Sequence, residues 1–157
     1  MRISKSVLMT VGILAGSVFV FGDADAQVPF PSGYRRWAVT RSLVVAPESR
    51  NAGFHHYYAN PIALEGFATG KFPDGSVIVD ERLEVEKRGS DTLEGKRVSV
   101  AVMMKDSRRY AETGGWGFDI AAGDGETLGA PSAVRTGCYS CHSKQKDHDF
   151  VFSAFRK

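Results

Sequence analysis

Two stretches of the chain alternate between hydrophobic and polar residues with the period of two that is typical of β-strands. They run from Ser76 to Glu86 and from Arg97 to Met104. The alternation gives each stretch one mostly apolar face and one mixed face. The mixed faces carry Ile78, Asp80, Arg82, Glu84 and Glu86 in the first stretch and Ser99, Ala101 and Met103 in the second. We therefore expect two long strands whose two faces have different environments.

The remaining predicted elements are shorter. Segments rich in aromatic and β-branched residues predict strands at Tyr34–Val45 (one strand or two), His55–Tyr58 and Trp116–Ala121. Apolar spacing predicts short helices at Ile62–Thr69, Lys105–Thr113 and His142–Phe155. Glycine, proline and polar residues predict connections at Phe72–Gly75, Gly89–Gly95 and Gly123–Gly137. Together these elements predict an α+β fold, in which an antiparallel β-sheet is accompanied by short helices.

The N-terminus has the three parts of a signal peptide. Two basic residues precede an apolar run over residues 7–21, and residues 24–26 have the small-x-small pattern of a cleavage site. A retained membrane anchor is the alternative, although a spanning helix needs about 20 apolar residues. We therefore expect residues 1–26 to be removed and residues 27–157 to form one domain exported to a bacterial periplasm.

Composition narrows the class of protein. Of 157 residues, 43% are hydrophobic, and 20 Lys+Arg nearly balance 18 Asp+Glu, which leaves a net charge of +2. This balance argues against nucleic-acid binding, and the apolar content argues against disorder. Two cysteines are too few for a disulfide-stapled mini-protein. Function must therefore be sought in motifs.

The motif Cys138-Tyr139-Ser140-Cys141-His142 is the C-x-x-C-H attachment sequence of a c-type haem. Two thiols one helical turn apart can form thioethers with both vinyl groups on one porphyrin edge. The histidine that follows then lies under the iron as the proximal ligand. The sequence therefore predicts one covalent haem c with His142 as the axial ligand, carried by a C-terminal attachment helix.

Three other interpretations of the two thiols are a disulfide or redox-active pair, a zinc site and a chance match. A redox pair would need a thioredoxin-like setting, which does not precede the motif. Zinc would need two further ligands, and only His55, His56 and His148 remain. Six residues beyond His142, His148 points well away from the iron on a helix and is expected at the surface.

The order of several sequence blocks resembles the cytochrome P-460 and cytochrome c′-beta family. These blocks are YRRW, GKFPDGSVIVDE, VMMKDSRRY, GGWGFDI, CYSCH and DFVF. The resemblance implies a single haem c on an antiparallel sheet, and the family analogy suggests a homodimer through that sheet. Phe152, in the last block, is expected to pack against the porphyrin edge.

Hydroxylamine-oxidising members of that family carry a lysine linked to the haem rim and a pocket carboxylate. By count from the Phe72–Gly75 turn, the lysine position is occupied by Asp80, and the carboxylate register falls on Ala101. Lys71 lies on the wrong side of the turn to replace that lysine. The resemblance therefore leaves open whether this chain is an enzyme.

The same register predicts the lining of the distal pocket. If Asp80 and Ala101 face the haem, the period of two also places Ile78 and Met103 there, with His55 or His56 nearby. Asp80 would then relay a proton to a bound ligand or accept a hydrogen bond from it, unless it has only a structural pairing with a basic residue.

Two functions follow from this pocket. In the first, iron held by His142 binds a small gaseous or nitrogen-oxide ligand such as nitric oxide, with or without redox turnover of hydroxylamine. In the second, Met103 (or, less favourably, His55 or His56) is the sixth ligand of an electron-transfer cytochrome, because thioether ligation raises the potential. The sequence does not identify a redox partner protein.

Overall fold

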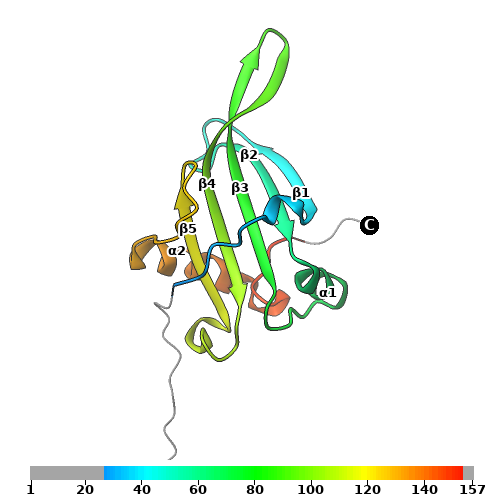
Figure 1. Ribbon diagram of the computed structural model, residues 1–157, viewed down its shortest axis with the longest axis vertical. Helices are drawn as coiled ribbons and strands as arrows, with labels where there is room; N and C mark the ends of the chain where they lie inside the picture. The colour runs from blue at the N-terminus through cyan, green and yellow to red at the C-terminus, as the bar shows by residue number, and fades with distance from the viewer. Residues whose placement is uncertain (1–26, 154–157) are drawn as a thin grey trace, which may run out of the picture.

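The computed structural model describes residues 27–153 and contains a five-stranded antiparallel sheet (Figure 1). The strands are β1 (Ala38–Val45), β2 (Gly53–Ala59), β3 (Val77–Arg88), β4 (Asp91–Lys105) and β5 (Trp116–Ala122). The α-helices are α1 (Pro61–Thr69) and α2 (Ser132–His142), and 3₁₀ turns span Tyr34–Arg36, Ala111–Thr113 and Ser143–His148. The predicted α+β fold is confirmed. The predicted signal peptide at 1–26 lies outside the described residues.

The sheet is a meander in which each strand pairs with the next strand along the chain, in the order β1-β2-β3-β4-β5. The β3–β4 hairpin continues past its neighbours as a two-stranded ribbon (Figure 1). There Arg88 pairs with Asp91, so the loop has two residues, and Gly89 takes φ 63°. The predicted connection at Gly89–Gly95 is therefore confirmed only at Gly89 and Ser90, because β4 already begins at Asp91. Charged residues are compatible with a loop and also with a two-stranded ribbon whose two faces are both solvated, so the local pattern does not distinguish the two.

The two faces of the sheet each bear an apolar cluster. The first face is covered by the N-terminal segment, which crosses β3 and β4 (Figure 1). Its cluster contains Val28, Tyr34, Tyr58, Val77, Val79, Val100, Val102, Tyr110, Ala121 and Leu128. The second face packs against α1, α2 and the chain after α2, through a cluster of Ala59, Ala63, Phe72, Ile78, Met103, Trp116, Phe118 and Val151. Both long strands are thus buried on both sides in their central part.

Local chemistry explains the bounds of α1. Asn60 caps it, because its Oδ1 accepts a hydrogen bond from Ala63 N at 2.8 Å, and Pro61 presets the first helical φ angle. Gly70 ends it in the left-handed region at φ 77°. The predicted helix and its end at Gly70 are confirmed.

Three other predicted elements need correction. The segment Tyr34–Val45 begins with a 3₁₀ turn, so only β1 is a strand, and Lys105–Thr113 is helical only over Ala111–Thr113. The predicted loop at Gly123–Gly137 already contains the start of α2 at Ser132, after Pro131.

No helix within residues 27–153 is long and apolar enough to cross a membrane.

The predicted closing helix His142–Phe155 is wrong over most of its described length. The α-helix ends at His142, a 3₁₀ turn follows, and the chain then reverses at Asp149 and Phe150, with φ of 50° and 65°. Left-handed backbone at two successive residues is incompatible with a helix. The contacts that hold this reversal are tertiary, which is why helical spacing misled the prediction.

Candidate functional site

A cavity of about 220 Å³ lies between the second face of the sheet and the segment formed by α2 and the chain after it. Its lining comes from all five strands and from the C-terminal part of the chain. The lining residues are Arg41, Tyr57, Ile78, Asp80, Ala101, Val102, Met103, Phe118, Asp119, Cys138, His142, Val151, Phe152 and Ser153. The structure therefore brings the C-x-x-C-H motif to the face on which the alternating residues were expected.

Two cross-strand rows make the sheet side of this cavity. One row is apolar: Ala59 pairs with Ile78, Ile78 with Met103, and Met103 with Phe118. In the neighbouring row, Arg41 pairs with Tyr57, Tyr57 with Asp80, and Asp80 with Ala101. The structure thus places the predicted set Ile78, Asp80, Ala101 and Met103 around one cavity, with one apolar half and one polar half.

The orientation of His142 is set by a backbone acceptor. Its Nδ1–H donates to the carbonyl oxygen of Phe150 at 2.7 Å, so the neutral ring keeps the lone pair on Nε2. The ring packs against Phe118 and Phe152 with centroid distances of 4.9 and 5.1 Å. Burial lowers the pKa of His142 below its usual range, although the hydrogen bond to Phe150 opposes this. At neutral pH, His142 therefore offers a metal-ligating nitrogen.

Both thiols of the motif are free. Cys138 is half-buried and lines the cavity, whereas Cys141, one helical turn later, is exposed. Burial raises the pKa of Cys138, and the nearby Cys141 and Asp119 add to this. Cys138 is therefore a neutral thiol at pH 7 in this surrounding.

The start of α2 is held by an aspartate that the sequence analysis missed. The Asp119 Oδ1 accepts hydrogen bonds from Ala130 N and Ile120 N, both at 2.8 Å. Its Oδ2 lies 3.9 Å from the guanidinium Nη1 of Arg135, in the first turn of α2. These contacts join β5 to the helix that carries both thiols. No short motif could have revealed the contacts with Ala130 and Arg135, because both partners lie outside β5.

Asp80 is held by His55 on the polar side of the cavity. Nδ1 of His55 lies 2.9 and 3.0 Å from the two Asp80 carboxylate oxygens, and Nε2 lies 2.8 Å from Asn51 O. Both ring nitrogens therefore face acceptors, which fits a doubly protonated imidazolium. The hydrogen bond to Asp80 accordingly raises the pKa of His55. With both nitrogens engaged, His55 has no lone pair to offer a metal.

His56 lies on the opposite face of the sheet. Its ring forms hydrogen bonds through Nδ1 with Ser42 Oγ at 2.7 Å and through Nε2 with Glu94 Oε1 at 2.8 Å. The expectation that His56 lies near the distal pocket is therefore wrong, because successive strand residues point to opposite faces. His148 is exposed, as expected, and Lys71 is exposed and does not line the cavity.

Tyr57 and Arg41 complete the polar half and were not predicted. Burial, together with the charge of Asp80, raises the pKa of Tyr57 to about 12, so the phenol stays protonated and can donate a hydrogen bond. The signal that could have found both residues is strand pairing, since they are the register partners of Asp80 along its row. That pairing is not visible in the local pattern of β1 or β2.

The donor set of this cavity fits a covalent haem. His142 presents Nε2, Cys138 faces the same cavity, and Cys141 is one helical turn away. Among residues 27–153, no three His, Cys, Asp or Glu side chains gather closely enough to hold a metal ion by themselves.

Comparison with known proteins gives one family. The family model of cytochrome P460 matches residues 31–153. A search of curated proteins gave no match. The matched region includes all five strands, both helices and the C-x-x-C-H motif. The chain therefore belongs to the cytochrome P460 family and is a haem-binding cytochrome.

Proposed function

We propose that this protein is an exported mono-haem c cytochrome whose iron binds a small nitrogen oxide, nitric oxide in the first place, on the side opposite His142. The observation that carries this proposal is the shared cavity. Cys138 and His142 line it together with a polar row of Arg41, Tyr57 and Asp80. An electron carrier with two protein ligands has no need of such a row.

The C-terminal motif would hold the haem. Cys138 and Cys141 would supply the two thioether sulfurs, and His142 would supply the axial nitrogen. When bound, haem supplies an iron that can take a diatomic ligand or change its oxidation state. The chain itself excludes water through the apolar row of Ile78, Met103 and Phe118, which are 5%, 7% and 6% exposed.

The polar side chains of the cavity would form hydrogen bonds with the bound ligand. The Tyr57 phenol can donate a hydrogen bond, and the Asp80 carboxylate, 28% exposed as a side chain, can accept one. Ala101, the next residue in this row, has a side chain small enough to leave space beside Asp80. The hydrogen bond from His55 Nδ1–H fixes the position of the Asp80 carboxylate. These groups support a ligand of a few polar atoms.

A second candidate is the electron-transfer cytochrome with Met103 as sixth ligand. Its support is that Met103 lines the same cavity as His142. Against it, Met103 packs in the apolar cluster with Ile78, Trp116 and Phe118, as an ordinary core methionine does. Met103 as the sixth ligand is therefore the alternative, and the next experiment distinguishes it from the proposed function.

Visible spectra with and without nitric oxide, for the natural protein and for Met103→Leu, test the proposal. Leucine conserves volume but removes the thioether. We expect no long-wavelength band of methionine–iron coordination in the oxidised natural protein, and the same nitric-oxide spectral change in both proteins. A band that Met103→Leu abolishes, together with nitric-oxide binding only in that variant, would establish the electron-transfer alternative.

Replacing Asp80 by alanine should separate ligands that carry a proton from those that do not. Hydroxylamine can donate a hydrogen bond to Asp80, and a bond to a charged acceptor contributes about 1.5–3 kcal/mol, or roughly tenfold or more in affinity. Nitric oxide has no proton to donate, so its affinity should change by less than about twofold. Spectral titration with each ligand measures both, with exposed Glu84→Ala as the control on the same strand. Equal losses for both ligands would contradict the role given to Asp80.

A further inference from the structure

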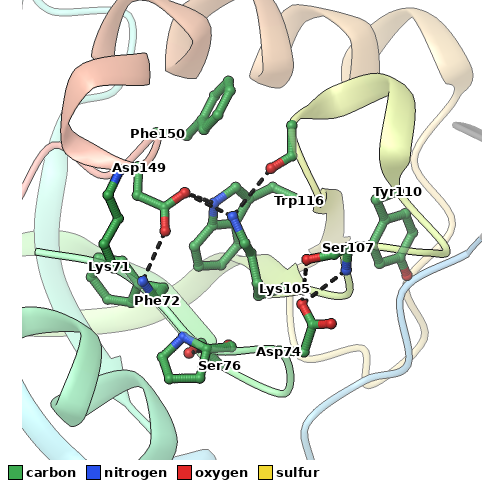
Figure 2. Close-up of polar contacts among 12 residues, drawn as sticks. Lys71, Phe72, Asp74, Ser76, Lys105, Ser107, Tyr110, Trp116, Asp149 and Phe150 are labelled. Atoms are coloured by element: carbon green, nitrogen blue, oxygen red, sulfur yellow. Dashed lines mark hydrogen bonds and ion pairs between the residues drawn. The ribbon is translucent and has the colours of Figure 1, made fainter.

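The chain after α2 is tied to one end of the sheet by a buried ion pair (Figure 2). Lys105 Nζ lies 2.7 Å from Asp149 Oδ1, and the two residues are 9% and 8% exposed. The other oxygen, Oδ2, accepts a hydrogen bond from Phe72 N at 2.8 Å, and Trp116 Nε1 lies 3.4 Å from Oδ1. One carboxylate thus gathers three donors.

These donors come from separate parts of the chain, two of them at strand ends. Phe72 precedes β3, Lys105 ends β4 and Trp116 begins β5. Lys105 Nζ also donates to Gly114 O at 3.1 Å and lies 5.1 Å from the centre of the Trp116 ring. Although burial opposes it, the hydrogen bonds from Lys105 and the Phe72 amide keep the pKa of Asp149 below its usual range. Asp149 is therefore an ionised anchor at the end of the sheet.

The backbone at this anchor has a conformation that needs support. Asp149 and Phe150 take φ of 50° and 65°, in the left-handed region that residues with side chains seldom adopt. Phe150 N–H donates to Gln145 O at 2.8 Å. The Phe150 ring stacks on Tyr139 at 6.2 Å and fills the space over Gly114, where an added Cβ would lie 2.2 Å from the ring.

This reversal turns the Phe150 carbonyl oxygen toward His142 Nδ1, at 2.7 Å. We propose that Asp149 and Lys105 form a positioning pair, which holds Phe150 so that its carbonyl accepts the Nδ1–H of His142 and thereby increases electron donation from Nε2 to the haem iron. Hydrogen bonds of this kind fix the ring and raise the basicity of a ligating histidine. The inference rests on the proposed role of His142 as axial ligand.

The reduction potential of the haem-loaded protein tests the inference, because two single variants change the charge in opposite directions. Asp149→Asn removes a negative charge and Lys105→Met removes a positive one. If the pair acts by positioning, both variants weaken the bond to His142 and both raise the potential. At a fixed solution potential, the ratio of reduced to oxidised protein should rise about tenfold, which corresponds to about 59 mV for one electron.

A pure charge effect gives a different result. It would raise the potential in Asp149→Asn and lower it in Lys105→Met, and that pair of opposite shifts would overturn the inference. Exposed Asp147→Asn, in the 3₁₀ turn that precedes Asp149, is the matched control and should leave the potential unchanged. Resonance Raman spectra of the reduced protein should show the iron–histidine stretch at lower frequency in both variants of the pair and unchanged in the control.

A third variant keeps the inference testable if the first two variants fail to fold. Gly114→Ala leaves every charge in place but pushes its Cβ against the Phe150 ring, so we expect the same upward shift of the potential. Unchanged potentials in all folded variants would overturn the inference. The proposed function fails separately: His142→Ala with an unaltered spectrum would show that His142 is not the axial ligand, whatever the pair does.

Discussion

Cys138→Ala/Cys141→Ala protein is expected to lose its covalently held haem completely. The two sulfurs are the only atoms of the chain proposed to form bonds to the porphyrin, and the chain has no other cysteine to replace them. His142 and the cavity would remain, so haem could still bind reversibly. On a denaturing gel, haem stain should follow the natural polypeptide and be absent from the double variant.

The single variants sharpen this prediction. Cys138 lines the cavity and Cys141 is exposed, but each should retain one thioether, so each should keep stain on the gel. Ser140→Ala, which changes an exposed residue inside the motif, is the control and should behave as the natural protein. Haem that stays with the denatured double variant would contradict the attachment and would point to another covalent link.

The second large effect is expected on the face of the sheet away from the cavity. Glu81 is 2% exposed and accepts hydrogen bonds from Tyr34 OH at 2.8 Å, Tyr58 OH at 3.2 Å and Arg35 Nε at 3.0 Å. Glu81→Ala removes the acceptor of two tyrosine hydroxyls and of a guanidinium. Each unsatisfied buried group costs about 1–3 kcal/mol, so the free energy of unfolding should fall by about 2–5 kcal/mol.

Urea unfolding measures this loss, with exposed Glu84→Ala, three residues along the same strand, as the control that should change little. The effect should also depend on pH. Burial acts to raise the pKa of Glu81, but hydrogen bonds from Arg35, Tyr34 and Tyr58 outweigh it and lower the pKa. The contribution is therefore present above the unfolded pKa of about 4.3 and lost as pH falls through the lower folded value.

The difference in unfolding free energy between the natural protein and Glu81→Gln should thus be largest near neutral pH and shrink in acid. A difference that stays constant from neutral to acid pH would show that the ionised form of Glu81 is not what the tyrosines and Arg35 stabilise. The period of two places Glu81 on the mostly apolar face of its strand, between Val79 and Leu83, but no local pattern identifies the tyrosines and the arginine that bind its carboxylate there.

Much of the fold follows from local patterns. The period of two predicted the two long strands, and Asn60, Pro61 and Gly70 explain why α1 begins and ends where it does. Predictions failed where the same residue types suit two structures. The charged residues of the β3–β4 ribbon were assigned to a loop, and the apolar residues after His142 were assigned to a helix.

The candidate site divides in the same way. The attachment motif is contiguous, so its chemistry could be inferred from five adjacent residues. The side-by-side placement of Asp80 and Ala101 required the register of β3 and β4, which the structure supplies. Tyr57 and Arg41 joined the site only through β2 and β1, whose pairing partners no local pattern identifies.

The amino-acid sequence by itself determined the alternation of strand faces, the start and end of α1 and the attachment motif, because each depends on residues only a few positions apart. Tertiary structure alone decided which side chains meet. Lys105 and Asp149 are 44 positions apart, and Tyr34 and Glu81 are 47 apart. Such pairs form only after strand register and the reversal at Asp149 are set, since burying a charge is stable only where its partners are already in place.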